Sequence, residues 1–192
     1  MYNGNSVSAY NTTGVSVKYL SAPVMTSAVN AEKGIKVCWD KVSGAQGYYL
    51  YRKTTGGWTK IATVKGNASV SYVDLSAQTG VKYTYTVKAY NGKITSASKS
   101  SVSGVLLNTP ELLGVEKVDT GARLVWESVA SAENYVVYKM SETWEWLELA
   151  TVDSTEYIDE TVVEGSVYTY TVKAVYKTCE SLYNTDGIKI EY

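Results

Sequence analysis

Seven residues occur twice in this chain without a single change. Residues 83–89 and residues 168–174 both read Tyr-Thr-Tyr-Thr-Val-Lys-Ala. The match extends outward, because residues 34–39 return as the similar block 121–126, and Asp74 returns as Asp159. The spacing between matched blocks changes by only a residue or two, as expected when loops between fixed strands vary in length. A repeat this faithful indicates an array of one folded unit.

The length of the chain sets the number of units. With 192 residues and a repeat near 85 residues, we expect two domains, one over residues 23–107 and one over residues 108–192, each with its own core. Residues 10–19 resemble residues 183–192, which would form the last strand of the second repeat. We therefore interpret residues 1–22 as the C-terminal strand of a preceding repeat. Such an orphan strand is expected to pair with a sheet edge, including that of a second copy.

The hydrophobic pattern has a period of two. Ile35, Val37 and Trp39 alternate with Lys36 and Cys38, and the heptapeptide alternates in the same way. This period predicts half-buried β-strands, and turn signals such as Gly56-Gly57 and Asn91-Gly92 separate them. The predicted fold class is all-β, as two tandem seven-stranded immunoglobulin-like sandwiches.

Several of these positions carry a resemblance to a known family. Pro23 and Pro110 open the first strand of their repeats, and Trp39 and Trp126 end the second. The third strand lies at 48–51 or 135–138, and the block at 80–83 or 165–168 leads into the heptapeptide. In this order, found twice, each unit resembles a fibronectin type III domain of the kind found in tandem on bacterial secreted and cell-surface proteins. The departure is the absence of Phe, with Tyr at many aromatic positions.

The resemblance implies roles for four aromatic residues and a location for the protein. Trp39 and Trp126 would be core residues. Tyr83 and Tyr168 would be corner tyrosines, whose rings fill the core while their hydroxyls bond upstream backbone. The protein would be extracellular or at the cell surface.

The two repeats carry opposite charge. Residues 23–107 hold eleven basic and three acidic residues, a net charge of +8, whereas residues 108–192 hold six basic and sixteen acidic residues, a net charge of −10. Such asymmetry concerns partners rather than fold, and we expect it to set the inter-repeat angle or to drive head-to-tail association. The lysines are scattered rather than clustered with aromatics, so no nucleic-acid partner is expected. No apolar run approaches the ~20 residues of a membrane helix, so we expect no membrane insertion.

Catalytic and metal-binding patterns are missing from the sequence. Without histidine, Ser-His-Asp and Cys-His arrangements are excluded. There is no phosphate-binding glycine loop, Cys-x-x-Cys pair or calcium loop, and the acidic residues of the second repeat lack regular ligand spacing. We expect no enzyme activity, no metal and no cofactor, and interpret the acidic residues as a solvated face.

Outward-facing aromatics are the candidate ligand-binding residues: Tyr49, Tyr51, Tyr138, Trp144 and Trp146. If Tyr48 and Leu50 point inward, their neighbours point outward, and Trp144 shares a face with Trp146 if that segment is a strand. Rows of exposed rings stack on sugars or anchor a protein partner. The competing interpretation is that these rings cover a sheet edge, or that the strand phase is slipped by one and they are buried.

From these observations we expect a non-catalytic spacer, display and adhesion module of an extracellular bacterial surface protein, making protein–protein contacts. The connector near residues 107–109 is short, which predicts a semi-rigid rod. The alternative is a carbohydrate-binding accessory module of a secreted glycan-degrading protein. The partner would thus be a protein or a glycan at a cell surface, with self-association through the N-terminal strand or through the opposite repeat charges.

Overall fold

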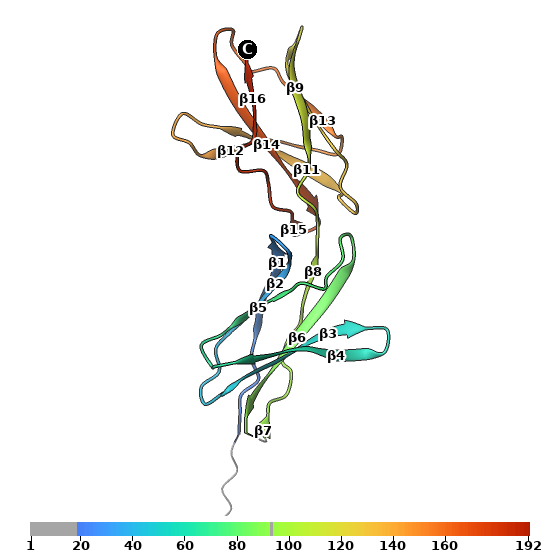
Figure 1. Ribbon diagram of the computed structural model, residues 1–192, viewed down its shortest axis with the longest axis vertical. Helices are drawn as coiled ribbons and strands as arrows, with labels where there is room; N and C mark the ends of the chain where they lie inside the picture. The colour runs from blue at the N-terminus through green and yellow to red at the C-terminus, as the bar shows by residue number, and fades with distance from the viewer. Residues whose placement is uncertain (1–18, 93) are drawn as a thin grey trace, which may run out of the picture.

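The computed structural model describes residues 19–92 and 94–192. Over these residues the chain forms sixteen β-strands and no helix. The strands build two sandwiches that lie end to end, β1–β8 in the first and β9–β16 in the second (Figure 1). The predicted remnant of a preceding repeat lies outside the described residues, apart from residues 19–22.

In the first sandwich, three strands face five. The smaller sheet has the order β1 (Met25–Ala31), β2 (Gly34–Trp39), β5 (Ser71–Asp74). The larger has the order β4 (Gly57–Lys65), β3 (Gly47–Thr54), β6 (Lys82–Asn91), with β7 (Ile94–Thr95) and β8 (Val102–Val105) both pairing with β6. Every pairing in these two sheets is antiparallel.

The second sandwich repeats this topology strand for strand. Its smaller sheet has the order β9 (Leu112–Val118), β10 (Gly121–Trp126), β13 (Glu156–Asp159). Its larger sheet has the order β12 (Trp146–Val152), β11 (Asn134–Met140), β14 (Val167–Tyr176), with β15 (Cys179–Glu180) and β16 (Ile188–Glu191) both on β14. The heptapeptides therefore lie in the equivalent strands β6 and β14.

Each sandwich has eight hydrogen-bonded strands where seven were expected, because the last strand is split in two. At Ser181 the backbone amide donates to the carbonyl of Ala174 (2.8 Å), but the Ser181 hydroxyl accepts from the Ala174 amide (2.9 Å) in place of a backbone group. The chain then leaves the ladder and lies across the outer face, where Thr171 Oγ1 donates to the carbonyl of Asn184 (2.8 Å). Ser96 makes the same break in the first repeat.

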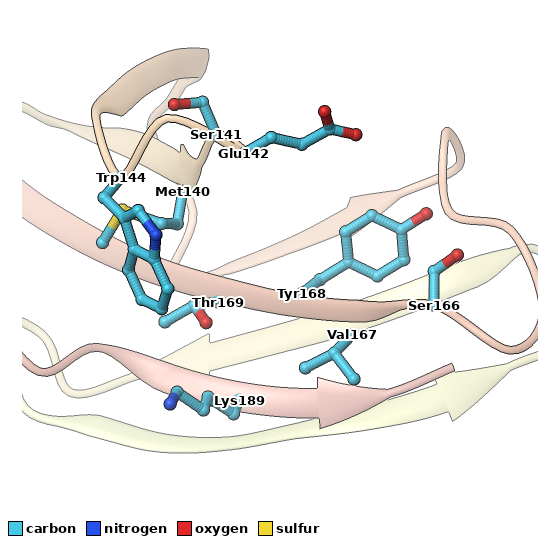
Figure 2. Close-up of a pocket in the computed structure, with 9 residues that line it drawn as sticks. All are labelled: Met140, Ser141, Glu142, Trp144, Ser166, Val167, Tyr168, Thr169 and Lys189. Atoms are coloured by element: carbon cyan, nitrogen blue, oxygen red, sulfur yellow. The ribbon is translucent and has the colours of Figure 1, made fainter.

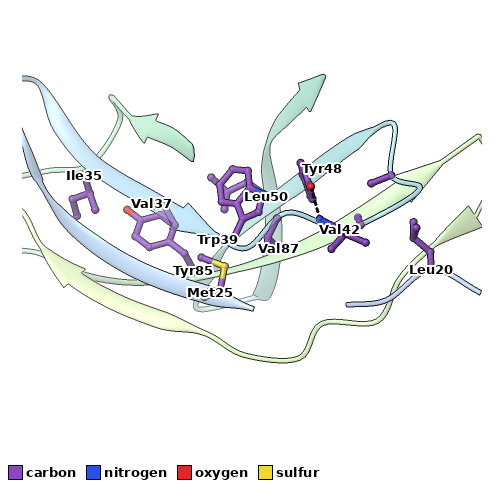
Figure 3. Packing of buried hydrophobic residues seen from close by; sticks show 12 residues of the cluster. Leu20, Met25, Ile35, Val37, Trp39, Val42, Tyr48, Leu50, Tyr85 and Val87 are labelled. Atoms are coloured by element: carbon purple, nitrogen blue, oxygen red, sulfur yellow. Dashed lines mark hydrogen bonds between the residues drawn. The ribbon is translucent and has the colours of Figure 1, made fainter. Parts of the chain in front are cut away.

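Alternating side chains from both sheets fill each core. Figure 3 shows the first core, in which Val37 and Trp39 of β2 lie against Leu50 of β3 and Tyr85 of β6. The Trp39 indole meets the Tyr48 ring edge-on, with centroids 5.4 Å apart. The second core repeats this pair with Trp126 and Tyr135 at 5.6 Å. Fully burying aromatic side chains of this size is a leading source of stability in a domain of about 85 residues.

Two partly buried tyrosines sit where the resemblance places corner tyrosines. The Tyr83 hydroxyl accepts a hydrogen bond from the amide of Gln78 (3.2 Å). The Tyr168 hydroxyl accepts one from the amide of Val163 (3.0 Å). In both repeats the acceptor thus reaches backbone five residues upstream while the ring packs against the core.

Hydrogen bonds and a buried connector residue join the two sandwiches at their junction. Leu107 of the connector is buried and belongs to the core of the second sandwich. The Asn30 side-chain amide, on β1, donates to the carbonyls of Val105 (3.0 Å) and Glu180 (2.8 Å), and its Oδ1 accepts from the Leu107 amide (2.8 Å). One side chain thereby joins β1, the connector and β15 of the second sandwich.

Candidate functional site

The outer face of the larger sheet in the second repeat carries most of the candidate aromatic residues. Along β14, Tyr168, Tyr170 and Val172 point to the core, so Thr169 and Lys173 point outward. Thr169 lies opposite Lys189 of β16 in the ladder. The outward side chains of β11, β14 and β16 therefore form one continuous surface.

Trp146 and Tyr138 are half-buried on this surface because the segment between β15 and β16 lies over them. Tyr183 of that segment meets Trp146 edge-on at 6.0 Å and Tyr138 at 6.4 Å between centroids. Lys173 Nζ lies 5.3 Å from the centroids of both tyrosines and pairs with the Glu180 carboxylate at 2.9 Å. Burial raises the pKa of the Tyr138 hydroxyl above its usual value. The rings of Tyr138 and Trp146 thus hold the crossing segment against the sheet through Tyr183.

Trp144 is in a different position, because it belongs to a turn and not to a strand: β12 begins at Trp146. The turn is closed by hydrogen bonds from the Ser141 amide to the Glu145 carbonyl (2.9 Å) and from the Trp144 amide to the Ser141 carbonyl (3.1 Å). Within it Trp144 adopts a φ of 63° and its side chain is 80% exposed. A positive φ at a bulky residue costs about 1–3 kcal/mol and marks a strained site.

The Trp144 indole forms one wall of a groove of about 390 Å³. Figure 2 shows the indole hanging from the β11–β12 hairpin over Thr169 toward Lys189, while Glu142 extends from the same hairpin. Val167, which is also exposed, lies along the floor. The groove thus combines an aromatic wall and an apolar floor with a carboxylate, a hydroxyl and an ammonium group, an arrangement suited to holding a polar ligand with one apolar face.

The corresponding face of the first repeat is covered by its own side chains. Tyr49 stacks on Tyr90 with centroids 4.5 Å apart, and Lys60 Nζ lies 4.7 Å from the Tyr49 centroid. Lys88 Nζ lies 5.6 Å from the Tyr51 centroid. Both candidate tyrosines of this repeat are therefore partly enclosed, and they do not join the second repeat's aromatics in one site.

A buried carboxylate in each repeat was not identified as a functional group from the sequence. Asp159 of β13 is 1% exposed and accepts four hydrogen bonds, from the Thr161 amide (2.9 Å) and hydroxyl (2.6 Å), Lys139 Nζ (2.9 Å) and the Tyr170 hydroxyl (2.8 Å). Because Lys139 and Tyr170 lie on the opposite sheet, the carboxylate ties the two sheets together. The signal in the sequence was its recurrence at the position of Asp74, together with a cation at Arg52 and Lys139.

The first repeat has the same network around Asp74. Its carboxylate accepts from Arg52 (2.8 Å), the Tyr85 hydroxyl (2.9 Å) and the Ser76 amide and hydroxyl (3.0 and 2.7 Å). Burial by itself would raise the pKa of this carboxyl group, but the hydrogen bonds outweigh it and hold the pKa below its usual value. Burial and the adjacent carboxylate raise the pKa of Tyr85. Asp74 therefore stays ionised beside Arg52 while Tyr85 stays neutral and donates its hydroxyl hydrogen, which is the behaviour of a structural network.

Residues 19–92 and 94–192 also lack two other kinds of site. In that part of the chain no group of three or more His, Cys, Asp and Glu side chains is placed to hold a metal ion. The same residues include no helix long and apolar enough to cross a membrane.

The chain is similar to solved structures rather than to known sequence families. No protein-family model matches the chain, and no curated protein matches it. The two fibronectin type III domain segment from chicken tenascin is 17% identical, with 90% of this chain and 99% of that one covered and a TM-score of 0.41. The FN1–FN3 domains of chicken CNTN1 are 18% identical, with 88% and 65% covered and a TM-score of 0.45.

A third similar structure, an Fn3-like protein from Clostridium thermocellum, is 31% identical over 43% of this chain and 92% of that one, with a TM-score of 0.37.

In each sandwich a three-stranded sheet faces a five-stranded one, in which two short strands both pair with β6 or with β14. A corner tyrosine lies near the start of β6 and of β14. Both repeats have the fibronectin type III fold.

Proposed function

We propose that this tandem of fibronectin type III domains is a non-catalytic spacer and display module of an extracellular bacterial surface protein, which makes adhesive contacts with other proteins. The observation that carries the proposal is the junction, where Asn30 bonds the connector and the second sandwich at once. A module that holds its neighbours at a set distance needs a junction of this kind, since domains joined by an unbonded linker move independently.

Further contacts across the junction support the same role. Ser131 of the second repeat donates to the carbonyl of Gly80 in the first (3.1 Å). Thr79 Oγ1 donates to the side chain of Asn108 in the connector (2.9 Å). With Leu107 buried as well, the connector is held at Leu107 and Asn108, which leaves little slack between the sandwiches.

The test is the distribution of distances between the repeats. Pairs of spin labels, one on each sandwich, should give a single narrow distance in the wild type. Asn30→Ala removes two donors and one acceptor and should broaden it. Asn30→Asp keeps the acceptor for the Leu107 amide but turns a carboxylate oxygen toward the carbonyls of Val105 and Glu180, so it should broaden the distribution at least as much. If the wild type gives a distribution as broad as that of Asn30→Ala, the spacer proposal is wrong.

Self-association is proposed as a second property of the module. The first repeat, at +8, complements the second, at −10, so the positive end of one copy would meet the negative end of another. Sedimentation velocity should then show association at low salt. The association should disappear near ~1 M salt, where the screening length of charges shortens to a few ångströms. The proposed pairing of the N-terminal strand predicts that deleting residues 1–20 lowers association at all salt concentrations, so unchanged sedimentation would contradict it.

A second candidate function is that of a carbohydrate-binding accessory module of a secreted glycan-degrading protein. The exposed indole of Trp144 beside a groove lined by polar side chains favours it. Retention of the purified chain on insoluble polysaccharide is the direct test, and a lack of retention on every polysaccharide tried would leave only the spacer proposal.

A further inference from the structure

The turn that carries Trp144 fixes its backbone in a costly conformation and exposes the indole. Asn or Gly would occupy a φ of 63° with less strain, and a polar side chain would suit a position that is 80% exposed. Besides its two backbone bonds, the turn is held by the Ser141 hydroxyl, which accepts from the Glu145 amide (3.0 Å). The backbone of this turn is thereby held by its own hydrogen bonds, so it need not be ordered when a ligand stacks on the exposed indole.

Three polar side chains around the groove have no partner among the described residues. Glu142, Thr169 and Lys189 line it, and none of them takes part in the side-chain hydrogen bonds or ion pairs found in residues 19–92 and 94–192. The carboxylate accepts, the ammonium group donates, and the hydroxyl does both. These groups surround an apolar wall and floor formed by Trp144 and Val167.

A pyranose ring matches this arrangement. Its C–H groups make an apolar face of the kind that lies flat on an aromatic ring, while its hydroxyls project around the edge as donors and acceptors. The volume of about 390 Å³ falls within the range of small-ligand sites. It is small for a folded partner, whose interface would extend well beyond the groove.

Charge decides between neutral and acidic sugars. Within the groove, Glu142 and Lys189 have opposite charges and together contribute none. Around it, Glu145 lies in the turn and Glu191 opposite Val167, and both are exposed. Because the repeat as a whole carries −10, a polyanionic glycan would be repelled within the screening length of about 8 Å at physiological salt.

The first repeat provides an internal comparison. At its equivalent ladder positions Ser103 replaces Lys189 and Lys82 replaces Val167, and residues 54–57 of its hairpin contain no tryptophan. The equivalent described positions of the first repeat thus lack the side chains that form the groove, although the two repeats share a fold. We propose that the groove beside Trp144 is a binding subsite for a neutral saccharide, with one pyranose ring stacked on the indole and its hydroxyls bonded by Glu142, Thr169 and Lys189. This inference rests on the second candidate function and names its ligand and its site.

The experiment is a titration of the full chain with neutral pentasaccharides (cellopentaose, laminaripentaose, maltopentaose and xylopentaose) and with acidic pentagalacturonate. Binding is measured by calorimetry and by tryptophan fluorescence. We expect one neutral series to bind with a Kd that changes less than about twofold between low and physiological salt. Trp144→Ala should weaken it at least about tenfold, as expected for loss of a central aromatic contact. Lys189→Met and Thr169→Val should each weaken it about threefold or more.

Trp58→Ala is the matched control, because Trp58 is the partly exposed tryptophan at the start of the equivalent strand in the first repeat, and its loss should leave binding unchanged. Binding of pentagalacturonate alone would overturn the neutral class. No binding of any pentasaccharide at ~10 mM, or binding unaffected by Trp144→Ala, would overturn the site. In the last case retention on insoluble polysaccharide separates the two ideas: retention that survives Trp144→Ala keeps the carbohydrate function and rejects only this groove.

Discussion

The substitution Asp159→Asn should destabilise the second repeat selectively, because the carboxylate of Asp159 is the point where its two sheets are tied together. Asparagine keeps the shape of the side chain, so no cavity forms. What changes is charge and donor pattern: an amide nitrogen replaces an oxygen that accepts hydrogen bonds, and Lys139 loses the only ion-pair partner it has among the described residues.

The expected magnitude follows from burial. Removing one partner of a buried ion pair costs about 3–5 kcal/mol. The Lys139 side chain is 23% exposed and is partly rehydrated after the change, which places the loss near the lower bound, about 3 kcal/mol. A domain of this size unfolds with a free energy of about 4–13 kcal/mol. At about 4–8 °C per kcal/mol, the melting temperature of the second repeat should fall by about 12–24 °C.

The loss should also depend on pH. Burial alone would raise the pKa of Asp159, but the hydrogen bonds from Thr161, Lys139 and Tyr170 hold it below its usual value of 3.8. A lowered pKa in the folded state means that the ionised carboxylate stabilises the fold above about pH 4, and that this contribution is lost as pH falls through the folded value. Wild type and Asp159→Asn should therefore differ most near neutral pH and converge in acid.

The assay is urea unfolding followed by tryptophan fluorescence at neutral pH and near pH 3, since each core contains a tryptophan, Trp39 or Trp126. Asp153→Asn is the control, because Asp153 is exposed between β12 and β13. A loss below about 1 kcal/mol at neutral pH, or a difference that stays constant into acid, would refute the account of this network.

Three further predictions concern single residues. Trp144→Asn should raise the free energy of unfolding by about 0.5–1 kcal/mol, because asparagine tolerates the positive φ and little apolar area is lost, and a rise in melting temperature would show it. Leu107→Ala should cost about 2–4 kcal/mol by chemical denaturation and broaden the inter-repeat distances, because Leu107 is buried at the junction. Gly187→Ala should cost about 1–3 kcal/mol by the same measure, since its φ is 65° and its Cβ would lie 2.8 Å from the Trp146 ring.

The arrangement of strands was the part most open to prediction from the sequence. The alternation around Val37 and Trp39 and the repeated heptapeptide are local patterns, and they correspond to strands β2, β6 and β14 in the structure. Periodicity identifies which side chains share a face, and burying one face of each strand then requires a sandwich.

The buried ion pairs depend on contacts that no local pattern encodes. Asp159 and Lys139 recur at the positions of Asp74 and Arg52, so the repeat marked them, but their pairing requires two sheets to meet face to face. Recurrence of a carboxylate together with a cation in both copies of a repeat is the signal that could have identified them.

The exposure of a candidate binding residue could be predicted only where no other segment of the chain covers the outward face of its strand. Trp144 was expected to share a face with Trp146 on a strand, and the turn that presents it was not foreseen. Trp146 and Tyr138 are half-buried because Tyr183 arrives from a segment that crosses the sheet, and alternation along a strand contains no information about such a crossing.

The split last strand bears on how a tandem of such similar repeats reaches its native state. Neighbouring copies of one heptapeptide, held close on the same chain, are prone to exchange strands during folding and form misassembled pairs. Breaking the outer strand at Ser96 and Ser181 leaves only strands of two and four residues along that edge of each sheet. Such short, interrupted edges are poor templates for a foreign strand. The same break that shapes the outer face therefore helps each repeat to complete its sheet with its own residues.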